Sequence, residues 1–331
     1  MGMQSVTPPV KARPFTDLFG DITAEDVAQI LRPAHNVNHQ MLTDGTTPLH
    51  HAKSASVAEA LIAHGANVNA KDYKGLTPIY HMRSASIAQV LVAHGANVNA
   101  PNFNGITPLH HIENPSYAEA LITLGADVNA RDRYGLTPLH HCKNASLAEA
   151  LIAHGADVNA ADREGRTPLH RACEIQDGET FVKVLVAHGA DVHARCVRGE
   201  TPLHQAASSH CVKDGMLDKK VGNLSIVHAL MSAGADINAR SWKGADHSGC
   251  TPLDRASEPD IYEAMVFAGA EVTRPPHYLS PECVEARDRG QARRQAVLRT
   301  QRAGSLDNLY AALDAPAEPV SPRPPRVRQR C

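Results

Sequence analysis

Short apolar segments recur along the chain, and each is closed by a Gly-Ala pair. Residues 57–64 are apolar on nearly every side, as expected of a short helix packed between neighbouring helices. A glycine directly after such a segment supplies the left-handed conformation that ends many helices. The pairs begin at Gly65, Gly95, Gly125, Gly155, Gly189, Gly234 and Gly269. The pattern therefore predicts one short buried helix, repeated along the chain.

A second motif, Thr-Pro followed by a hydrophobic residue, precedes each of these segments. It begins at Thr47, Thr77, Thr107, Thr137, Thr167, Thr201 and Thr251, with successive spacings of 30, 30, 30, 30, 34 and 50 residues. Threonine is a good N-cap, and proline fits the first turn of a helix, where its missing N–H costs nothing. Leu49 and Ala52 then lie on one helical face. We expect a very short first helix over residues 48–53 and over the equivalent residues of each repeat.

The start of the second helix has its own signal nine residues before each glycine. These candidate N-caps are Ser56, Ser86, Ser116, Ser146, Thr180, Ser225 and Asp260. Five of them have Glu or Gln three residues later, as in Ser56 and Glu59, which is the pattern of a capping box. We therefore expect the second helices to begin directly after these residues.

One repeat is thus a helix, a loop, a second helix and a projecting turn that ends in a glycine such as Gly75. A helix pair this short cannot bury its apolar faces alone, so the repeats must stack. The Thr-Pro-Leu-His motif, as in Thr47–His50, and the closing Gly-Ala-Asp/Asn-Val/Ile-Asn/His-Ala motif resemble the ankyrin-repeat family. The resemblance covers about residues 21–274. It implies an all-α solenoid of stacked helix pairs with projecting β-turn fingers.

The repeats divide the chain into an array and two flanking segments. Residues 1–20 are expected to be a flexible N-terminal segment, and residues 21–45 a degenerate opening repeat. Further repeats start near 46, 76, 106, 136, 166, 200 and 250, with an insertion at 208–223 that is expected to form a surface loop. Four repeats have 30 residues where ankyrin repeats usually have about 33. Residues 275–331 are expected to be a basic C-terminal extension, helical near its start and disordered from about 315.

Composition supports a closely packed helical array. Hydrophobic residues make up 43% of the chain but aromatic residues only 4%, so the core must consist of Ala, Leu, Val and Ile. The charge is uneven, because residues 274–331 hold 11 Arg, no Lys and 6 acidic residues, whereas the chain as a whole has a net charge of −2. Its seven cysteines include no C-x-x-C pair, which favours reduced thiols over a zinc or redox site. With no apolar leader or membrane-length run, the expected location is the cytoplasm, or a host cytosol or nucleus if the protein is an effector.

Histidine is the one residue type that could suggest chemistry, with 20 copies. The resemblance implies that the fourth motif position, as in His50, forms structural hydrogen bonds around the Thr-Pro turn. A second row follows at His51, His81, His111 and His141. Packed helices lie about 8–10 Å apart, too far for equivalent histidines to share a zinc ion. No catalytic or nucleotide-binding motif is present. We therefore expect no enzyme activity, no metal, no cofactor and no small-molecule substrate.

The resemblance implies that a partner protein meets the turn tips and the first-helix face. Four of the 13 aromatic residues lie at the tips, together with basic side chains, and such residues often dominate binding energy. The candidate partner-binding residues are Tyr73, Lys74, Phe103, Asn104, Arg133, Tyr134, Arg163, Arg198, Trp242 and Lys243 at the tips, and His51, His81, His111 and His141 on the first-helix face. The expected molecule is a monomeric scaffold for a partner with an acidic surface. The alternative is an adaptor or host-directed effector whose basic extension engages a second partner, either a protein, an acidic membrane or nucleic acid.

Overall fold

The computed structural model describes residues 25, 27, 36–175, 178–208, 223–242, 249–273 and 279–300. The chain forms two compact units, unit 1 at Met1–Gln205 and unit 2 at Ala206–Cys331, each of which is treated by itself below. Regular structure in the described residues is helical, apart from one isolated β-bridge between Ser208 and Ala256. The all-α prediction is therefore confirmed.

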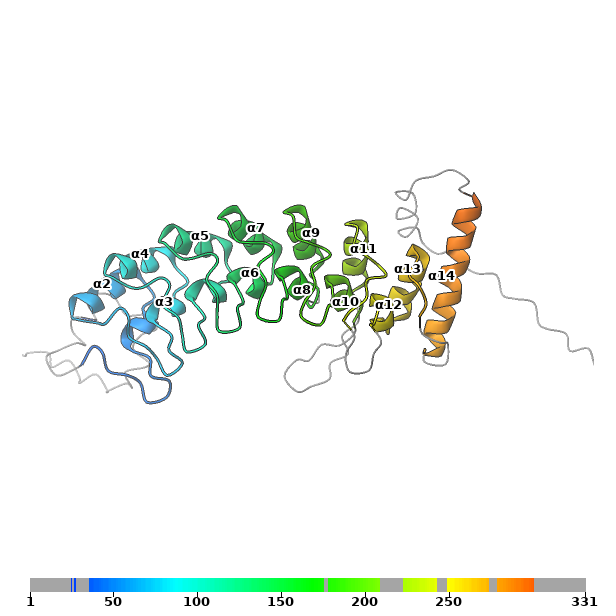
Figure 1. Ribbon diagram of the computed structural model, residues 1–331. Helices are drawn as coiled ribbons and strands as arrows, with labels where there is room; N and C mark the ends of the chain where they lie inside the picture. Colours follow the sequence, from blue (N-terminus) through cyan, green and yellow to red (C-terminus); the bar gives the residue numbers. More distant parts are fainter. Residues whose placement is uncertain are drawn as a thin grey trace, which may run out of the picture. The chain divides into compact units, whose positions relative to one another are not determined.

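Unit 1 consists of two rows of short helices, with turns projecting beside the first row (Figure 1). The first helices are η2 (Pro48–His51), α3 (Pro78–His81), η3 (Pro108–His111), α6 (Pro138–His141) and α8 (Pro168–Ala172). The second helices are α2 (Ala55–Ala63), α4 (Ala85–Ala93), α5 (Pro115–Thr123), α7 (Ala145–Ala153) and α9 (Glu179–Ala187). Successive members of each row pack against one another, so the repeats stack as the sequence predicts.

The core of unit 1 lies between the two rows and is built from equivalent leucines and isoleucines. Leu49, Ile79, Leu109, Leu139 and Leu169 of the first helices are at most 2% exposed, as are Leu61, Leu91, Leu121, Leu151 and Leu185 of the second helices. Burial of one such side chain stabilises the fold by about 1.5–3 kcal/mol. Because every repeat contributes at the same two positions, the core runs the length of the unit.

The second helices begin two residues earlier than the serine pattern predicts. Asn114 and Asn144 are N-caps, and their side chains accept hydrogen bonds from Tyr117 N (3.1 Å) and Leu147 N (2.8 Å). Ser56 is therefore already inside its helix, because the N-cap is Ser54. The predicted N-caps and their capping boxes are wrong, because the residue two positions earlier, Ser54, Asn114 or Asn144, caps the helix instead. The first helices are also shorter than predicted, ending at His51 in η2.

The glycine prediction is confirmed. Gly65, Gly95, Gly125 and Gly155 follow the second helices with φ between 87° and 94°, in the left-handed region that L-residues with side chains disfavour. Each amide donates back into the end of the preceding helix, as Gly65 N does to Ile62 O at 2.8 Å. The chain can therefore turn sharply into the next loop.

Unit 2 contains α11 (Leu224–Ser232), α12 (Pro252–Arg255), α13 (Pro259–Ala268) and the long α14 (Pro281–Thr300). Helix α10 (Pro202–Ala207) crosses the division between the units. The basic helix expected after residue 280 is α14, and it packs along α13. Cys283 and Ala286 of α14 are buried. The expected insertion loop, except at its two ends, and residues 301–331 lie outside the described residues.

Candidate functional site: the turn tips and first-helix face

Four turn tips of unit 1 are each held by an acidic or amide side chain. Asp72 Oδ1 accepts hydrogen bonds from Lys74 N and Leu76 N, both at 2.8 Å. Asn102, Asp132 and Asp162 make the same pair of bonds in the following tips. Such bonds close the turn on itself, so the tip conformation is set before any partner arrives.

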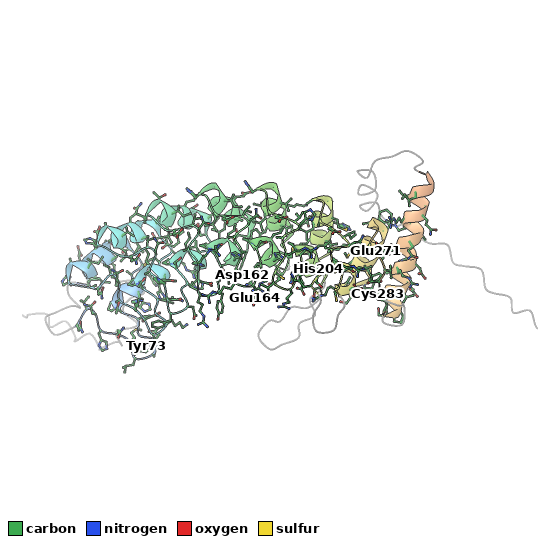
Figure 2. All side chains as sticks on the ribbon, in the orientation of Figure 1. Tyr73, Asp162, Glu164, His204, Glu271 and Cys283 are labelled. Carbon is green, nitrogen blue, oxygen red and sulfur yellow. The ribbon has the colours of Figure 1, made fainter. Side chains whose placement is uncertain are left out.

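Neighbouring tips are also bonded to one another through the backbone. The amides of Tyr73, Arg133, Arg163 and Val197 donate to the carbonyl oxygens of Asp44, Asn104, Tyr134 and Glu164, respectively, at 2.8–2.9 Å. The tips of unit 1 therefore form a strip beside the first helices, with Tyr73 at the end of its turn (Figure 2). Backbone bonds join all neighbouring tips of this strip except those of Tyr73 and Phe103, where the Phe103 ring packs on Gly75 instead. A partner can meet this strip without first ordering it.

Three aromatic side chains of the strip remain largely exposed. Tyr73 is 56% exposed, Phe103 70% and Tyr134 53%. The Tyr73 ring lies directly over Gly45, where a Cβ atom would collide with it. The Phe103 ring lies over Gly75 with slightly more room, since a Cβ atom there would be 3.1 Å from the ring. Backbone support on one side and exposure on the other leave rigid apolar surfaces facing solvent.

Basic side chains lie at the same turn tips as these rings. The Arg133 guanidinium donates to Asn104 Oδ1 at 2.7 Å and lies 4.7 Å from the centre of the Tyr134 ring. Lys74, Arg163 and Arg198 are exposed at their tips. The predicted tip residues up to Arg198 thus lie together on unit 1. The two others, Trp242 and Lys243, belong to unit 2.

Charge is segregated between the two sides of unit 1. The described cations in the turns, first helices and residues directly following those helices are Lys53, Lys71, Lys74, Arg83, Arg131, Arg133, Lys143, Arg163, Arg166, Arg171, Arg195 and Arg198. The second helices and the loops after them carry Glu59, Glu119, Asp127, Glu149, Asp157, Glu179 and Asp191. Lys183 is the described cation on that side, and it pairs with Glu179 at 2.6 Å. On the basic side, Asp72 and Asp132 are buried within turns, whereas Asp44, Glu113 and Glu164 are exposed acids among the more numerous cations.

The fourth motif position holds buried histidines that join one repeat to the next. Thr47 N donates to His50 Nδ1 at 3.0 Å, so the proton of the neutral ring sits on Nε2, which donates to Leu76 O of the next repeat at 3.2 Å. His110, His140 and His170 make the same bridge. Burial lowers the pKa of His50 to about 4. The structural role that the resemblance implies for these histidines is confirmed.

One repeat departs from this pattern. Tyr80 stands at the fourth position of the motif that begins at Thr77, and Thr77 Oγ1 is left without a hydrogen-bond partner. The Tyr80 hydroxyl faces the backbone of Asn102 but makes no hydrogen bond of ordinary geometry. The bridge that His50 and His110 form is therefore absent here.

The next position carries the second histidine row, on the first-helix face. His81 Nε2 lies 3.5 Å from Asp72 Oδ2, and His141 Nε2 lies 3.3 Å from Asp132 Oδ2. His51 Nε2 lies 2.9 Å from Thr46 Oγ1. Among the described residues, no group of three or more His, Cys, Asp and Glu side chains is placed to hold a metal ion.

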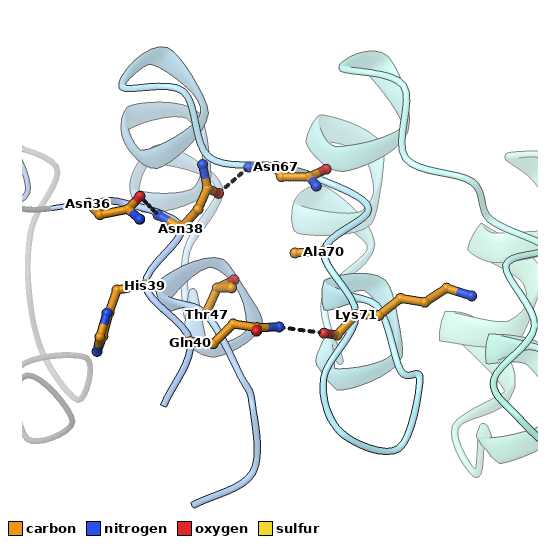
Figure 3. Close-up of a pocket in the computed structure, with 8 residues that line it drawn as sticks. All are labelled: Asn36, Asn38, His39, Gln40, Thr47, Asn67, Ala70 and Lys71. Atoms are coloured by element: carbon orange, nitrogen blue, oxygen red, sulfur yellow. Dashed lines mark hydrogen bonds between the residues drawn. The ribbon is translucent and has the colours of Figure 1, made fainter. Parts of the chain in front are cut away.

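A polar groove lies at the first repeat of unit 1, between the loop of Asn38 and that of Lys71 (Figure 3). Hydrogen bonds already cross it: Asn67 N donates to Asn38 Oδ1 at 2.7 Å, and Gln40 Nε2 donates to Lys71 O at 2.8 Å. The same asparagine bridge recurs in later repeats, as between Asn97 N and Asn69 Oδ1. These contacts join neighbouring repeats, so the groove is part of the stacking.

Trp242 lies in unit 2 and is 61% exposed. The preceding residue is held by a bond from Ser241 N to Cys250 O at 2.9 Å. Lys243, predicted to accompany the tryptophan, lies outside the described residues. Trp242 is thus an exposed aromatic tip of its own unit.

The repeats and their turn strip are those of an ankyrin array. A family model described as ankyrin repeats (3 copies) matches residues 22–102, 80–162 and 142–241, and the chain belongs to this family. Ankyrin repeats are generally protein–protein interaction modules. No helix among the described residues combines the length and apolar character needed to cross a membrane.

Comparison with individual proteins adds little to the family assignment. No curated protein matches the chain. Among solved structures, the chain is similar to the ankyrin repeat domain of Bcl-3, described as a unique member of the IkappaB protein family. The two are 25% identical, the match covers 63% of this chain and 91% of that chain, and the TM-score is 0.48.

Proposed function

We propose that the array is a non-catalytic scaffold that binds a partner protein through the turn strip and first-helix face of unit 1. One observation supports this most: Tyr73, Phe103 and Tyr134 present exposed rings on tips that are bonded to their neighbours. Exposed aromatic surface on rigid backbone binds at low cost in conformational entropy. Isolated exposed aromatics are ordinary, but three on successive turn tips favour an interface.

The basic residues around the strip indicate the character of the partner. Lys74, Arg133, Arg163 and Arg198 are exposed at the tips, whereas Glu164 is the exposed acid among the same tips. We infer that the partner presents an acidic surface to this side. Charges at the rim of such an interface mainly raise the association rate, and their effect weakens with salt.

The test compares a tip variant with a matched control on the opposite side of unit 1. The tip variant carries Tyr73→Ala, Phe103→Ala and Tyr134→Ala, and the control carries Glu59→Ala, Glu119→Ala and Glu149→Ala on the second helices. Proteins retained by the wild-type chain are identified by mass spectrometry, and a retained candidate is purified for affinity measurement. The proposal expects affinity to be lost in the tip variant and kept in the control. Equal affinity of all three chains would place the interface elsewhere.

The adaptor alternative assigns a second partner to the basic extension. Arg289 and Arg293 of α14 are ion-paired with Glu263 of α13, at 2.7 and 3.1 Å, so these two arginines stabilise unit 2. An adaptor function would therefore depend on the remaining arginines, most of them beyond α14. Removing residues 301–331 while keeping α14 tests this: the adaptor alternative requires loss of one partner with the array's partner retained.

A further inference from the structure

The first-helix face of unit 1 carries a titratable row within a basic surface. The row consists of His51, His81, His111 and His141, one on each of four successive repeats. We propose that this row makes the array bind an acidic protein segment more tightly as the pH falls below about 7, because the row takes up protons on binding. This inference rests on the proposed function, since it assigns a regulation to the same face.

His51 begins the row and is half-buried. Its Nε2 atom contacts the Thr46 hydroxyl at 2.9 Å, and the carboxylate of Asp44 and the ring of His81 also act on it. Burial is the largest influence and lowers the pKa of His51, which Asp44 partly offsets. The ring is therefore neutral at neutral pH and gains charge on acidification.

His81 faces a buried carboxylate on one side and two other imidazoles on the other. Its Nε2 atom lies 3.5 Å from Asp72 Oδ2, and its ring meets that of His50 edge-on with centres 5.3 Å apart. The charge of His51 would act on His50 and His81 alike. Since Asp72 also holds the tip of Tyr73, the His81 ring is fixed against the turn strip.

His111 has the least acidic surroundings of the row. The corresponding turn residue is Asn102 instead of aspartate, so no turn carboxylate faces the ring. Tyr80 packs against it with ring centres 6.3 Å apart, and Lys143 lies near enough to disfavour a second positive charge. Burial, then Lys143, lower the pKa of His111. An acidic group of a partner would supply the counter-charge that is missing here.

His141 ends the row beside both an acid and a base. Its Nε2 atom lies 3.3 Å from Asp132 Oδ2, and its ring meets that of His110 edge-on at 5.3 Å. Arg171 and His111 are the cations, actual or potential, that face it. Burial is the largest influence and lowers the pKa of His141, which Asp132 partly offsets.

These surroundings give the sign of the pH effect. The lysines and arginines on this side of unit 1 keep the face basic throughout the pH range of interest. Protonation of the histidine row adds further positive charge to the same face. A carboxylate placed against a row histidine favours the imidazolium, so binding raises the pKa of that ring. Each proton taken up on binding strengthens the complex by up to about tenfold per unit of pH decrease.

The usable pH window is set by the buried histidines of the same motif. His50, His110 and His140 have pKa values lowered to about 4 by burial and must stay neutral to bridge the repeats. The binding effect is therefore to be sought above the pH at which these residues titrate, between about pH 5.5 and 7.5.

The experiment measures binding of a fluorescein-labelled peptide of about ten aspartates, whose carboxylates stay ionised across this window. Three full-length chains are compared by fluorescence anisotropy at each pH, with circular dichroism to confirm folding. The row variant carries His51→Gln, His81→Gln, His111→Gln and His141→Gln, and glutamine can still donate to Asp72 and Asp132. The matched control carries His64→Gln, His94→Gln, His154→Gln and His188→Gln, four exposed histidines that end the second helices.

The proposal expects the wild-type and control chains to bind the peptide at least about tenfold more tightly at pH 5.5 than at 7.5, and the row variant to lose most of this difference. Peptide binding with no pH dependence, or with the same dependence in the row variant, overturns the inference but leaves the proposed function intact. Absence of binding at every pH overturns the acidic-partner proposal and the inference with it. A folded row variant with a reduced dependence also excludes a purely structural role for the row.

Discussion

Two rows of histidines run side by side through unit 1 and differ in what they do. In the pair His140 and His141, the first ring is 3% exposed and bonded at both nitrogens, to Thr137 N and to Arg166 O, whereas the side chain of the second is 25% exposed. Both residues are histidines, and they are adjacent in the sequence. What separates the two rows is burial and the number of hydrogen bonds that each ring makes: His140 bonds three groups, whereas His141 bonds Asp132 alone.

The difference indicates that the first row stabilises the fold, whereas the second row belongs to the surface. A neutral buried imidazole that accepts at Nδ1 and donates at Nε2 satisfies three groups that would otherwise be orphaned, including one in the next repeat. A partly exposed imidazole beside a carboxylate contributes little to stability, because water competes for the same bonds. The predictions below test this separation, beginning with the largest expected effect.

Acidification should weaken the array through the first row. The folded-state pKa values of His50, His110 and His140 are about 4, below the ordinary value of 6.5, so the unfolded chain binds more protons between these limits. Stability is then complete above pH 6.5 and is lost as the pH falls towards 4, by up to about 1.4 kcal/mol per pH unit for each histidine. Urea unfolding followed by circular dichroism at several pH values measures this loss. A midpoint that stays constant from pH 6.5 to 4.5 would contradict the assignment of the first row.

Substitution should separate the rows within one repeat. His140→Ala leaves Thr137 N, Thr137 Oγ1 and Arg166 O without their partner and should lower the free energy of unfolding by about 2–4 kcal/mol. His141→Ala, the matched control, should cost below about 1 kcal/mol, because it loses one contact at a partly exposed site. Both are measured by urea unfolding at neutral pH. Equal losses would mean that the second row also holds the repeats together.

The repeat array and the C′ glycines could be predicted from the sequence, because each rests on a local signal repeated in phase. The structural role of the first histidine row is implied by the resemblance to ankyrin repeats. The helix starts could not be predicted: Ser54 and Ser56 are both suitable caps, and only packing decides between them. The support of Tyr73 by Gly45 and the ladder of tip hydrogen bonds also escaped prediction, since they join residues from different repeats. The tip and row residues could be named from the sequence, but the charge segregation becomes visible only when the helices are assigned to sides.

The tips should behave as a binding surface, like the second row and unlike the first. Tyr134→Ala should lower affinity for the partner by about 2 kcal/mol, because an exposed ring on a fixed turn has the properties of an interface anchor. Its effect on the unfolding midpoint should be small, since Tyr134 contacts solvent and the Arg133 guanidinium more than the core. Leu139→Ala serves as the contrast, with a stability loss of about 2–5 kcal/mol. Affinity that falls only in proportion to stability would argue against an anchor.

The exception in the first row offers the finest test of the comparison. At Thr77–His81 the fourth residue is Tyr80, and Thr77 Oγ1 lacks the nitrogen that Thr107 finds in His110. Tyr80→His should restore the bridge within the repeat and to the next one, raising the free energy of unfolding by about 1 kcal/mol at pH 7.5.

The gain is limited because the tyrosine ring packs against His111, and a smaller imidazole forfeits part of that contact. Tyr80→Phe is the matched control: it keeps the ring and removes a hydroxyl that makes no well-formed hydrogen bond, so it should leave stability within about 0.5 kcal/mol of wild type. A restored bridge must also bring the pH dependence of the first row to this repeat. The stabilisation from Tyr80→His should therefore shrink as the pH falls below 6.5, whereas any effect of Tyr80→Phe should not change. A gain that is equal at pH 7.5 and 5 would come from packing and would leave the bridging account of the first row without support at this position.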